Sequence, residues 1–233
     1  MGTDNARNIG TVIVTGGASG LGAAVVDAVA NAGGIPVVLD RRAPRAAAHY
    51  VEVDLSDSKE AEEAVHRAAE EAGAPAAVVT CAGTDVPGPF VDTPTETWER
   101  IVAVNLLGTA AVVRAALPYL LERQGKIVTI ASTLGHRVFG DASAYCASKF
   151  GVVGFTRALQ AELKGRVGIT MLTPGGMHTA FFDERDEQYK PGADARLCQP
   201  ADVASAVLFA LTRPAGCEVK EMVVAPATET SWP

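Results

Sequence analysis

Short apolar runs alternate with longer stretches of helical spacing along this chain. The runs are rich in Val and Ile and cover residues 11–15, 35–39, 49–53, 76–80, 126–131, 167–172 and 221–225. Continuous apolar runs are typical of strands that are buried on both faces, as in a parallel sheet. Helical spacing covers residues 20–32, 57–72, 95–123, 143–164 and 200–212. The alternation predicts an α/β fold, with a doubly wound, mostly parallel seven-stranded sheet and helices on both faces.

Length and net charge limit the classes of protein to which this chain can belong. A chain of 233 residues can bury one large α/β core, so we expect a single domain over residues 1–233. Its net charge of −7 argues against nucleic-acid binding, which needs a basic face. The polar residues 1–10 do not resemble a secretion signal, and we expect no apolar stretch long enough to span a bilayer. We therefore expect a cytoplasmic protein with no membrane partner.

The cysteines give no sign of a metal site. Cys81, Cys146, Cys198 and Cys217 are scattered and lack the close pairing of zinc ligands. They are also too few to cross-link a chain of this size. We predict reduced thiols and no bound metal.

A glycine-rich segment, TGGASGLG, follows the first strand and opens the first helix at residues 15–22. Gly16, Gly20 and Gly22 let the backbone turn tightly and approach a phosphate, and the helix N-terminus supplies partial positive charge. A glycine turn alone can merely reverse the chain. Asp40, however, ends the second strand, where a carboxylate can accept hydrogen bonds from an adenosine ribose. The two features together predict a dinucleotide site.

The segment AYCASKFG, residues 144–151, places a tyrosine and a lysine four positions apart. On a helix this spacing puts Tyr145 and Lys149 on one face, one turn apart. Lys149 can then change the ionisation of Tyr145. The alternative is a half-buried ring beside a solvated charge.

These segments resemble the short-chain dehydrogenase/reductase family, and the resemblance covers nearly the whole chain. TGGASGLG is similar to the family's TGxxxGxG loop, and YCASK is similar to its YxxxK motif. Asn105 in VNLLG matches the family's helix asparagine, and Ser132 in TIAST matches its catalytic serine. PGGMHT, residues 174–179, looks like the PGxxxT segment beside the nicotinamide. The resemblance implies a single Rossmann-like domain that binds NAD(P).

The resemblance also implies a division of catalytic work. A free tyrosine has a pKa near ~10, which is too high for proton exchange at neutral pH, and the Lys149 ammonium would lower it. Ser132 would hold the substrate oxygen beside Tyr145, and Asn105 would interrupt regular helix bonding and hold a water that links Lys149 to solvent. Outside this motif context, Ser132 suits a cap of a turn and Asn105 suits a cap at a helix start.

The residues that the resemblance assigns to the cofactor are Thr15, Gly16, Ser19, Gly20, Leu21, Gly22, Asp40, Arg41, Asp54, Leu55, Ala82, Gly83, Tyr145, Lys149, Pro174, Gly175, Met177 and Thr179. Asp40 would repel a 2′-phosphate and accept a 2′-hydroxyl, which favours NAD over NADP. Ser19 points the same way, because relatives that prefer the phosphate often have Lys or Arg there. Arg41 and Arg42 could instead neutralise a 2′-phosphate, so NADP stays the second choice.

Some positions depart from the family pattern. The family's NNAG is replaced by residues 80–83, Thr-Cys-Ala-Gly, which keep the Ala-Gly pair near the ribose but lose the asparagine that braces the sheet. Cys81 is small enough to be buried at this position. Asp54 matches the family's acid at the adenine amino group, and its alternative role is an N-cap, for which Asp57 is better placed.

Residues 180–199, here called the substrate segment, occupy the place of the family's mobile cover over the substrate. Phe181, Phe182 and Tyr189 could close over an apolar ligand or pack against the body of the protein, and the mixed charges of the segment suggest no anchor for a phosphate or carboxylate. The expected substrate-binding residues are Ser132, His136, Phe139, Tyr145, Phe181 and Phe182.

The resemblance predicts an oxidoreductase that moves a hydride between the cofactor and a small secondary alcohol or ketone. An NADPH-dependent 3-oxoacyl-thioester reductase has the same motifs, and a dinucleotide-sensing binding protein is the alternative outside enzymes. The helix at 143–163 carries apolar residues around much of its circumference, which favours a homodimer or homotetramer.

Overall fold

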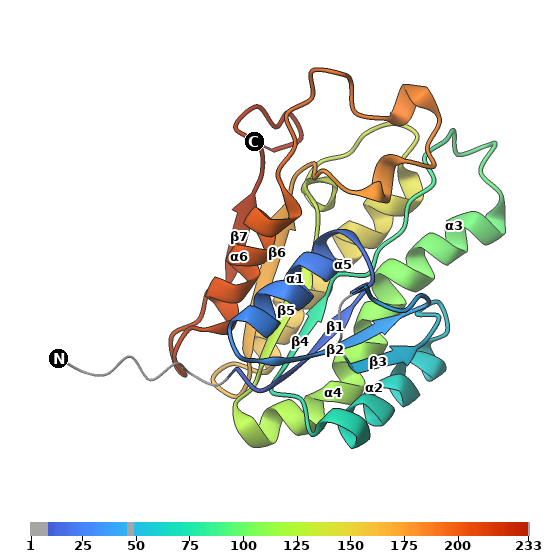
Figure 1. Cartoon of the computed structure of the whole chain (residues 1–233). Coiled ribbons are helices and arrows are strands. Elements are labelled where there is room, and N and C mark those ends of the chain that lie inside the picture. The colour runs from blue at the N-terminus through green and yellow to red at the C-terminus, as the bar shows by residue number, and fades with distance from the viewer. Residues whose placement is uncertain (1–8, 46–48, 233) are drawn as a thin grey trace.

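A computed structural model describes residues 9–45 and 49–232. Residues 1–8, which carry the expectation about a secretion signal, lie outside the described part. The fold is one seven-stranded sheet with the strand order β3-β2-β1-β4-β5-β6-β7, and every neighbouring pair is parallel (Figure 1). The order reverses between β1 and β4, so the predicted doubly wound sheet is confirmed.

The strands agree with the apolar runs of the sequence to within two residues at either end. They are β1 Thr11–Thr15, β2 Ile35–Asp40, β3 His49–Glu52, β4 Ala77–Thr80, β5 Lys126–Ile130, β6 Gly168–Pro174 and β7 Glu221–Val224. Strands β1 and β4 are buried along their whole length, as expected for the centre of a parallel sheet.

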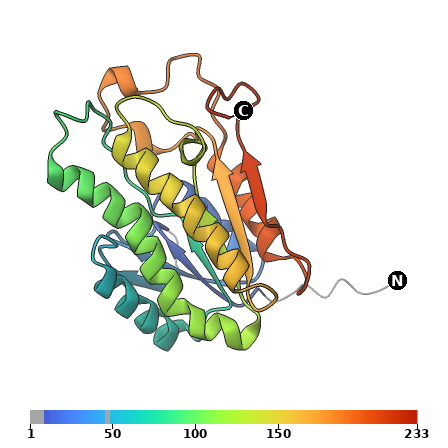
Figure 2. The ribbon, with the colours of Figure 1, turned by 180° about the vertical axis from the view of Figure 1, so that it is seen from behind.

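Helices cover both faces of the sheet. Helices α1 Gly20–Asn31 and α6 Pro200–Leu211 pack on one face, and α2 Ser58–Ala72, α4 Thr109–Arg123 and α5 Ser143–Glu162 cover the other. Figure 2 shows α4 and α5 side by side on that second face. Three short 3₁₀ turns, Thr133–Gly135, Ala180–Phe182 and Glu187–Tyr189, lie in the loops.

Alternate residues of each central strand feed the two cores. In β1, Ile13 belongs to the core beneath α2 and α4, whereas Val12 and Val14 belong to the core beneath α1 and α6. In β4, Val78 and Val79 divide in the same way. Side chains that alternate between two buried faces explain why the strands read as continuous apolar runs.

The stretch 95–123, expected as one helix, consists of three joined pieces. Helix α3 Thr95–Val102 leads into a π-helical segment, Ala103–Gly108, and then into α4. Contrary to the expectation above, the run Thr95–Arg123 is long and apolar enough to span a membrane by length and composition. Half of its most apolar part is buried inside the protein. It therefore serves this fold as a core helix.

Candidate active site

The tyrosine and lysine of the YxxxK segment lie together at the start of α5. The Lys149 Nζ lies 5.7 Å from the centroid of the Tyr145 ring. Lys149 is 4% exposed, and its ammonium donates a hydrogen bond of 2.9 Å to the carbonyl oxygen of Ile130, at the end of β5. The lysine is thus not a solvated surface charge, and its position relative to the tyrosine is fixed by the sheet.

Ser132 follows β5 and lies beside this pair. Its hydroxyl accepts a hydrogen bond of 3.1 Å from the Leu134 amide, which caps the 3₁₀ turn Thr133–Gly135. It also forms a hydrogen bond with the Tyr145 side chain. The capping role considered for Ser132 is present, and it holds the hydroxyl next to the phenol. The catalytic role stays a prediction.

The chain's own groups do not make Tyr145 acidic. Burial raises the pKa of Tyr145 to about 12, against a smaller lowering by the hydrogen bond with Ser132. Burial also lowers the pKa of Lys149 to about 8. Burial therefore dominates the pKa of Tyr145, and the lowering expected from Lys149 is not found among its causes. Further positive charge is needed beside the phenol to make it a base near neutral pH.

Asn105 lies inside the π-helical segment, as the expected break in helix bonding requires. Its Oδ1 accepts a hydrogen bond of 2.8 Å from the Thr84 amide, and its Nδ2 donates to the Thr84 carbonyl and the Ser148 hydroxyl, both at 3.0 Å. Asn105 is not a helix-start cap, because helix continues on both sides of it. It connects the loop after β4 to α5.

The glycine turn after β1 leaves room for a ligand at the start of α1. Gly16 and Gly20 have φ angles of +68° and +53°, which favour glycine, and a Cβ at Gly22 would lie 2.1 Å from the Gly16 carbonyl oxygen. The side chain of Ser19 does not cap α1, so the first amides of the helix face the turn without a side-chain partner there. Such amides suit the diphosphate of a dinucleotide.

Two further loops border the glycine turn. Asp40 accepts hydrogen bonds from the amides of Ala18, at 3.1 Å, and Arg42, at 3.0 Å, so its carboxylate lies at the turn, where a ribose would bind. Thr15 accepts a hydrogen bond of 3.1 Å from the Ala82 amide, and a Cβ at Gly16 would lie 2.8 Å from the Ala82 Cα. Thr15 thus braces the β1 and β4 ends against each other.

Asp54, predicted to contact adenine, has partners within the chain. Burial raises its pKa, but hydrogen bonds from Arg100, at 2.8 Å, and from the side chain and amide of Ser56 outweigh burial and hold the pKa at about 2. Asp57 caps α2, as expected. The neighbouring Leu55 is buried in the core, and Arg41 is exposed just beyond β2. The adenine contact of Asp54 stays a prediction.

The PGGMHT segment returns the chain to the glycine turn. Pro174 ends β6, the Gly175 amide donates to the Val224 carbonyl at 3.0 Å, and Met177 forms a single bridge with Cys198. A Cβ at Gly20 would lie 3.3 Å from the Thr179 Cγ2. Lys149 and Asn105 approach from the other side, since a Cβ at Gly83 would lie 3.8 Å from the Lys149 Nζ and 3.6 Å from the Asn105 Oδ1.

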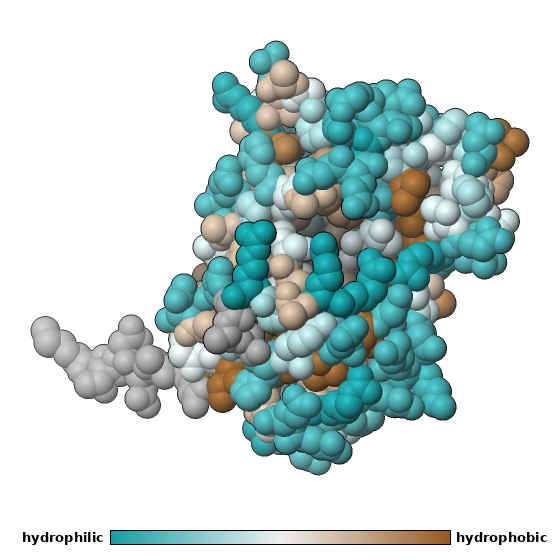
Figure 3. Space-filling model, turned by 45° about the vertical axis from the view of Figure 1, so that its right-hand side comes forward, coloured by the Kyte–Doolittle hydropathy of each residue, from teal (hydrophilic) through white to brown (hydrophobic). Residues whose placement is uncertain are grey.

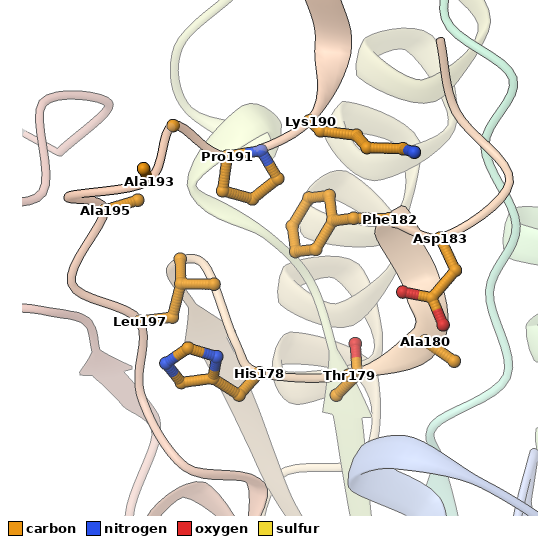
Figure 4. Close-up of a pocket in the computed structure, with 11 residues that line it drawn as sticks. His178, Thr179, Ala180, Phe182, Asp183, Lys190, Pro191, Ala193, Ala195 and Leu197 are labelled. Carbon is orange, nitrogen blue, oxygen red and sulfur yellow. The ribbon is translucent and has the colours of Figure 1, made fainter. Parts of the chain in front are cut away.

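A cavity of about 720 Å³ opens between the two ends of the substrate segment (Figure 4). On one side it is lined by His178, Thr179, Ala180, Phe182 and Asp183, and on the other by Lys190, Pro191, Gly192, Ala193, Ala195 and Leu197. Tyr145 and Ser132 do not line it. Through Thr179 the cavity borders the glycine turn, so it adjoins the expected cofactor site.

The expected substrate residues divide into two groups. The Phe181 ring lies 5.8 Å from the Tyr145 ring, and Phe182 packs edge-on against Phe181 at 5.5 Å. His136 instead lies 3.3 Å from the Thr173 hydroxyl and 5.1 Å from the Trp232 ring, and Phe139 is 55% exposed. The structure brings Phe181 to Tyr145, with Phe182 packed against Phe181, and places the His136 ring against Trp232.

Comparisons with known proteins agree with this geometry. The sequence pattern of the short chain dehydrogenase family matches residues 10–190. An uncharacterized oxidoreductase of Staphylococcus aureus (strain MW2) is 31% identical over 92% of this chain and 96% of its own length. The chain belongs to the short-chain dehydrogenase/reductase family. A glycine betaine reductase of Emericella nidulans is 32% identical over 93% of this chain, which spans 19% of that longer protein.

Solved structures of the family show the same fold. An aldohexose dehydrogenase of Thermoplasma acidophilum has a TM-score of 0.86 at 24% identity, over 96% of this chain and 95% of its own. A closed serine dehydrogenase in complex with NADP⁺ has a TM-score of 0.86 at 25% identity, over 94% of this chain and 96% of its own. As a member of this family, the protein is an NAD(P)-dependent oxidoreductase.

Two contacts at the site were not predicted from the sequence. An ion pair joins Asp85, after β4, to Arg185 of the substrate segment, with 2.8 Å between the Asp85 Oδ2 and the Arg185 Nη2. In addition, Ser231 is buried and donates a hydrogen bond of 2.7 Å to Thr133, next to Ser132. No motif marks these contacts, since each joins residues about a hundred positions apart in the chain.

Proposed function

We propose that the protein transfers a hydride between NAD and a secondary alcohol or ketone. The observation that carries this proposal is the trio at the end of β5 and the start of α5. Tyr145 is hydrogen-bonded to Ser132, and the Lys149 ammonium lies 5.7 Å from the tyrosine ring. A binding protein without catalysis has no need of a buried ammonium beside a half-buried phenol.

The protein's own residues perform the proton transfer. Ser132 donates to the substrate oxygen and holds it beside Tyr145. During alcohol oxidation the phenolate of Tyr145 accepts the hydroxyl proton, and during ketone reduction the phenol returns a proton to the oxygen. Lys149, fixed by the Ile130 carbonyl, stabilises the phenolate. The nicotinamide, when bound, accepts or supplies the hydride.

NAD is the proposed cofactor, with NADP as the alternative. Asp40 lies at the glycine turn, where its charge opposes a 2′-phosphate and accepts a 2′-hydroxyl. Arg41 and Arg42 follow Asp40 and are exposed, so both can reach a bound 2′-phosphate. They favour NADP only where their positive charge outweighs the negative charge of Asp40. A structurally similar serine dehydrogenase was solved with NADP⁺, which supports NADP as the alternative.

Replacing Tyr145 with Phe tests the function. We expect turnover of a responsive alcohol to fall by about a thousandfold, since general acid–base catalysis contributes ~10²–10⁴. The affinity for NADH, measured by fluorescence, should stay within about threefold, because the glycine turn is untouched. Unchanged responses in both assays would support a dinucleotide sensor instead.

We also propose a homodimer or homotetramer in the cytoplasm. Phe150 on α5 and Leu107 in the π segment are 44% and 49% exposed. Helices α4 and α5 lie side by side on the outside of the molecule (Figure 2). Apolar side chains at neighbouring exposed sites favour a contact between copies. Light scattering that returned only a monomer at micromolar concentration would contradict the assembly.

A further inference from the structure

We propose that Arg185 binds a carboxylate of the substrate, so that the preferred substrates are hydroxy acids and the corresponding oxo acids. The inference rests on the proposed function, because it specifies the substrate class of the same site. It differs from the expectation, based on the sequence, that the mixed charges of the substrate segment offer no binding group for a carboxylate.

Arg185 lies within reach of the catalytic centre. The Phe181 ring is in contact with Tyr145, at 5.8 Å between ring centroids, and the Arg185 Cζ lies 4.8 Å from the centroid of Phe181. The charges of Asp85 and Arg185 both act on the pKa of Tyr145, the first raising it and the second lowering it. A substrate whose hydroxyl is held at Tyr145 can therefore extend toward Arg185.

The guanidinium is held in one orientation and has unused donors. Its Cζ lies 4.8 Å and 4.7 Å from the rings of Phe181 and Phe182, which restrict the guanidinium plane. Arginine has five N–H donors, and Asp85 accepts from Nη2. Among the described residues, the buried Nε has no hydrogen-bond partner. A planar group with free donors suits a carboxylate, which can accept two hydrogen bonds at once.

The charge balance of the site also favours an anion. Near Tyr145, Lys149 is buried and the Arg185 side chain is 13% exposed, and Asp85, 4% exposed in its side chain, opposes their charge. The oxidised nicotinamide adds one more positive charge when it binds. A substrate carboxylate reduces this excess, whereas an ammonium group would increase it.

Asp85 acts in this arrangement as a positioning residue. Its single hydrogen bond with Arg185 directs the guanidinium and compensates its charge when no substrate carboxylate is present. A buried arginine with no acid nearby would be costly. The pair therefore keeps the receptor in place without using all of its donors.

The test compares acids with their neutral esters. Initial rates with NAD⁺ would be measured for 2-, 3- and 4-hydroxy acids and their methyl esters, using the wild type, Arg185→Leu and Arg185→Lys. For the best acid, we expect Arg185→Leu to raise KM by about 10- to 100-fold and to change KM for the ester by less than about threefold. Arg185→Lys should restore part of the loss. Arg196→Leu, an exposed arginine of the same segment, is the matched control and should change neither.

A binding measurement separates this inference from the proposed function. Calorimetry with the Tyr145→Phe protein in complex with NADH would compare acetoacetate with methyl acetoacetate, and needs no turnover. Tighter binding of the acid, lost with Arg185→Leu, supports the carboxylate site even if no hydride transfer is found. Equal affinity for acid and ester, or an equal loss of both with Arg185→Leu, would overturn it. If Tyr145→Phe loses activity but the wild type shows no preference for the acid, the proposed function stands and this inference is wrong.

Discussion

The glycine turn and the substrate segment are held in place by different kinds of contact. Around the glycine turn, buried strands and close backbone approaches define the site, as when a Cβ at Gly22 would meet the Gly16 carbonyl. The substrate segment has two 3₁₀ turns and many exposed residues, and it is tied down by side chains, namely Arg185 to Asp85 and Tyr189 to Asp141. Cofactor binding is thus built into the backbone, whereas substrate choice depends on a few side chains that can be exchanged singly.

The loops around the site carry exposed apolar side chains. Val86, Phe90 and Val91, in the loop before α3, are exposed by 56%, 72% and 87%, and Val138 is also exposed. Figure 3 shows hydrophobic atoms at the edge of the molecule, beyond a surface that is mostly hydrophilic. These loops lie at the carboxyl ends of the strands, where substrate enters open α/β sheets.

The largest expected effect tests the buried catalytic pair. Lys149→Met should lower turnover by about a thousandfold, because the Tyr145 phenolate loses the ammonium that we propose stabilises it, and general acid–base catalysis contributes ~10²–10⁴. It should also stabilise the fold near neutral pH by about 1–3 kcal/mol, since burial lowers the pKa of Lys149 from 10.5 to about 8 and a buried cation is costly.

Urea unfolding at several pH values checks the sign of this effect. Between the folded pKa of about 8 and the ordinary value of 10.5, the unfolded chain binds more protons at Lys149, so the free energy of unfolding of the wild type should rise with pH there. The Lys149→Met variant should lack this rise. A variant less stable than the wild type near neutral pH would show that the ammonium contributes to the fold.

An intermediate effect is expected at the glycine turn. Asp40→Asn keeps the size of the side chain but removes the charge that opposes a 2′-phosphate. The ratio of kcat/KM with NADP to that with NAD should rise by about tenfold, because two nearby like charges at the protein surface repel by about one kcal/mol or more. Asp27→Asn, an exposed acid on α1, is the control and should leave the ratio unchanged.

The smallest effect is expected where a single exposed contact holds the substrate segment. Tyr189→Phe removes the hydrogen bond of 2.9 Å from the Tyr189 hydroxyl to Asp141, whose backbone also accepts from Gly88. We expect KM to rise by about two- to threefold with kcat unchanged, since one exposed hydrogen bond contributes little. Steady-state kinetics of the wild type and of Tyr189→Phe measure KM and kcat. A change of kcat alone would contradict this role of Tyr189.

The sequence predicted the features that depend on residues close together in the chain. Continuous apolar runs predicted the strands, and the four-residue spacing placed Tyr145 beside Lys149. The interruption of helix bonding at Asn105 was predicted from the family resemblance, whereas the spacing of residues 95–123 predicted one continuous helix. Local spacing also marked the glycine turn, because a close backbone approach requires a residue without a side chain.

The rest of the site depends on contacts between distant parts of the chain. Nothing near Asp85 indicates that Arg185 will pair with it, and nothing near His136 indicates that Trp232 will pack on it. The pKa of Tyr145 also depends on how much water the fold removes, which no spacing of residues reveals. Folding creates these properties, so only the folded arrangement shows them.

The central claim is that the bound cofactor and Lys149 together turn a phenol with a high pKa into a working base. Titration of phenolate absorbance, taken as the difference between the wild type and Tyr145→Phe, measures this pKa directly. The protein alone should titrate at about 12, and the complex with NAD⁺ several units lower, with Lys149→Met abolishing the shift. A Tyr145 pKa that stays above about 10 with NAD⁺ bound would contradict the account.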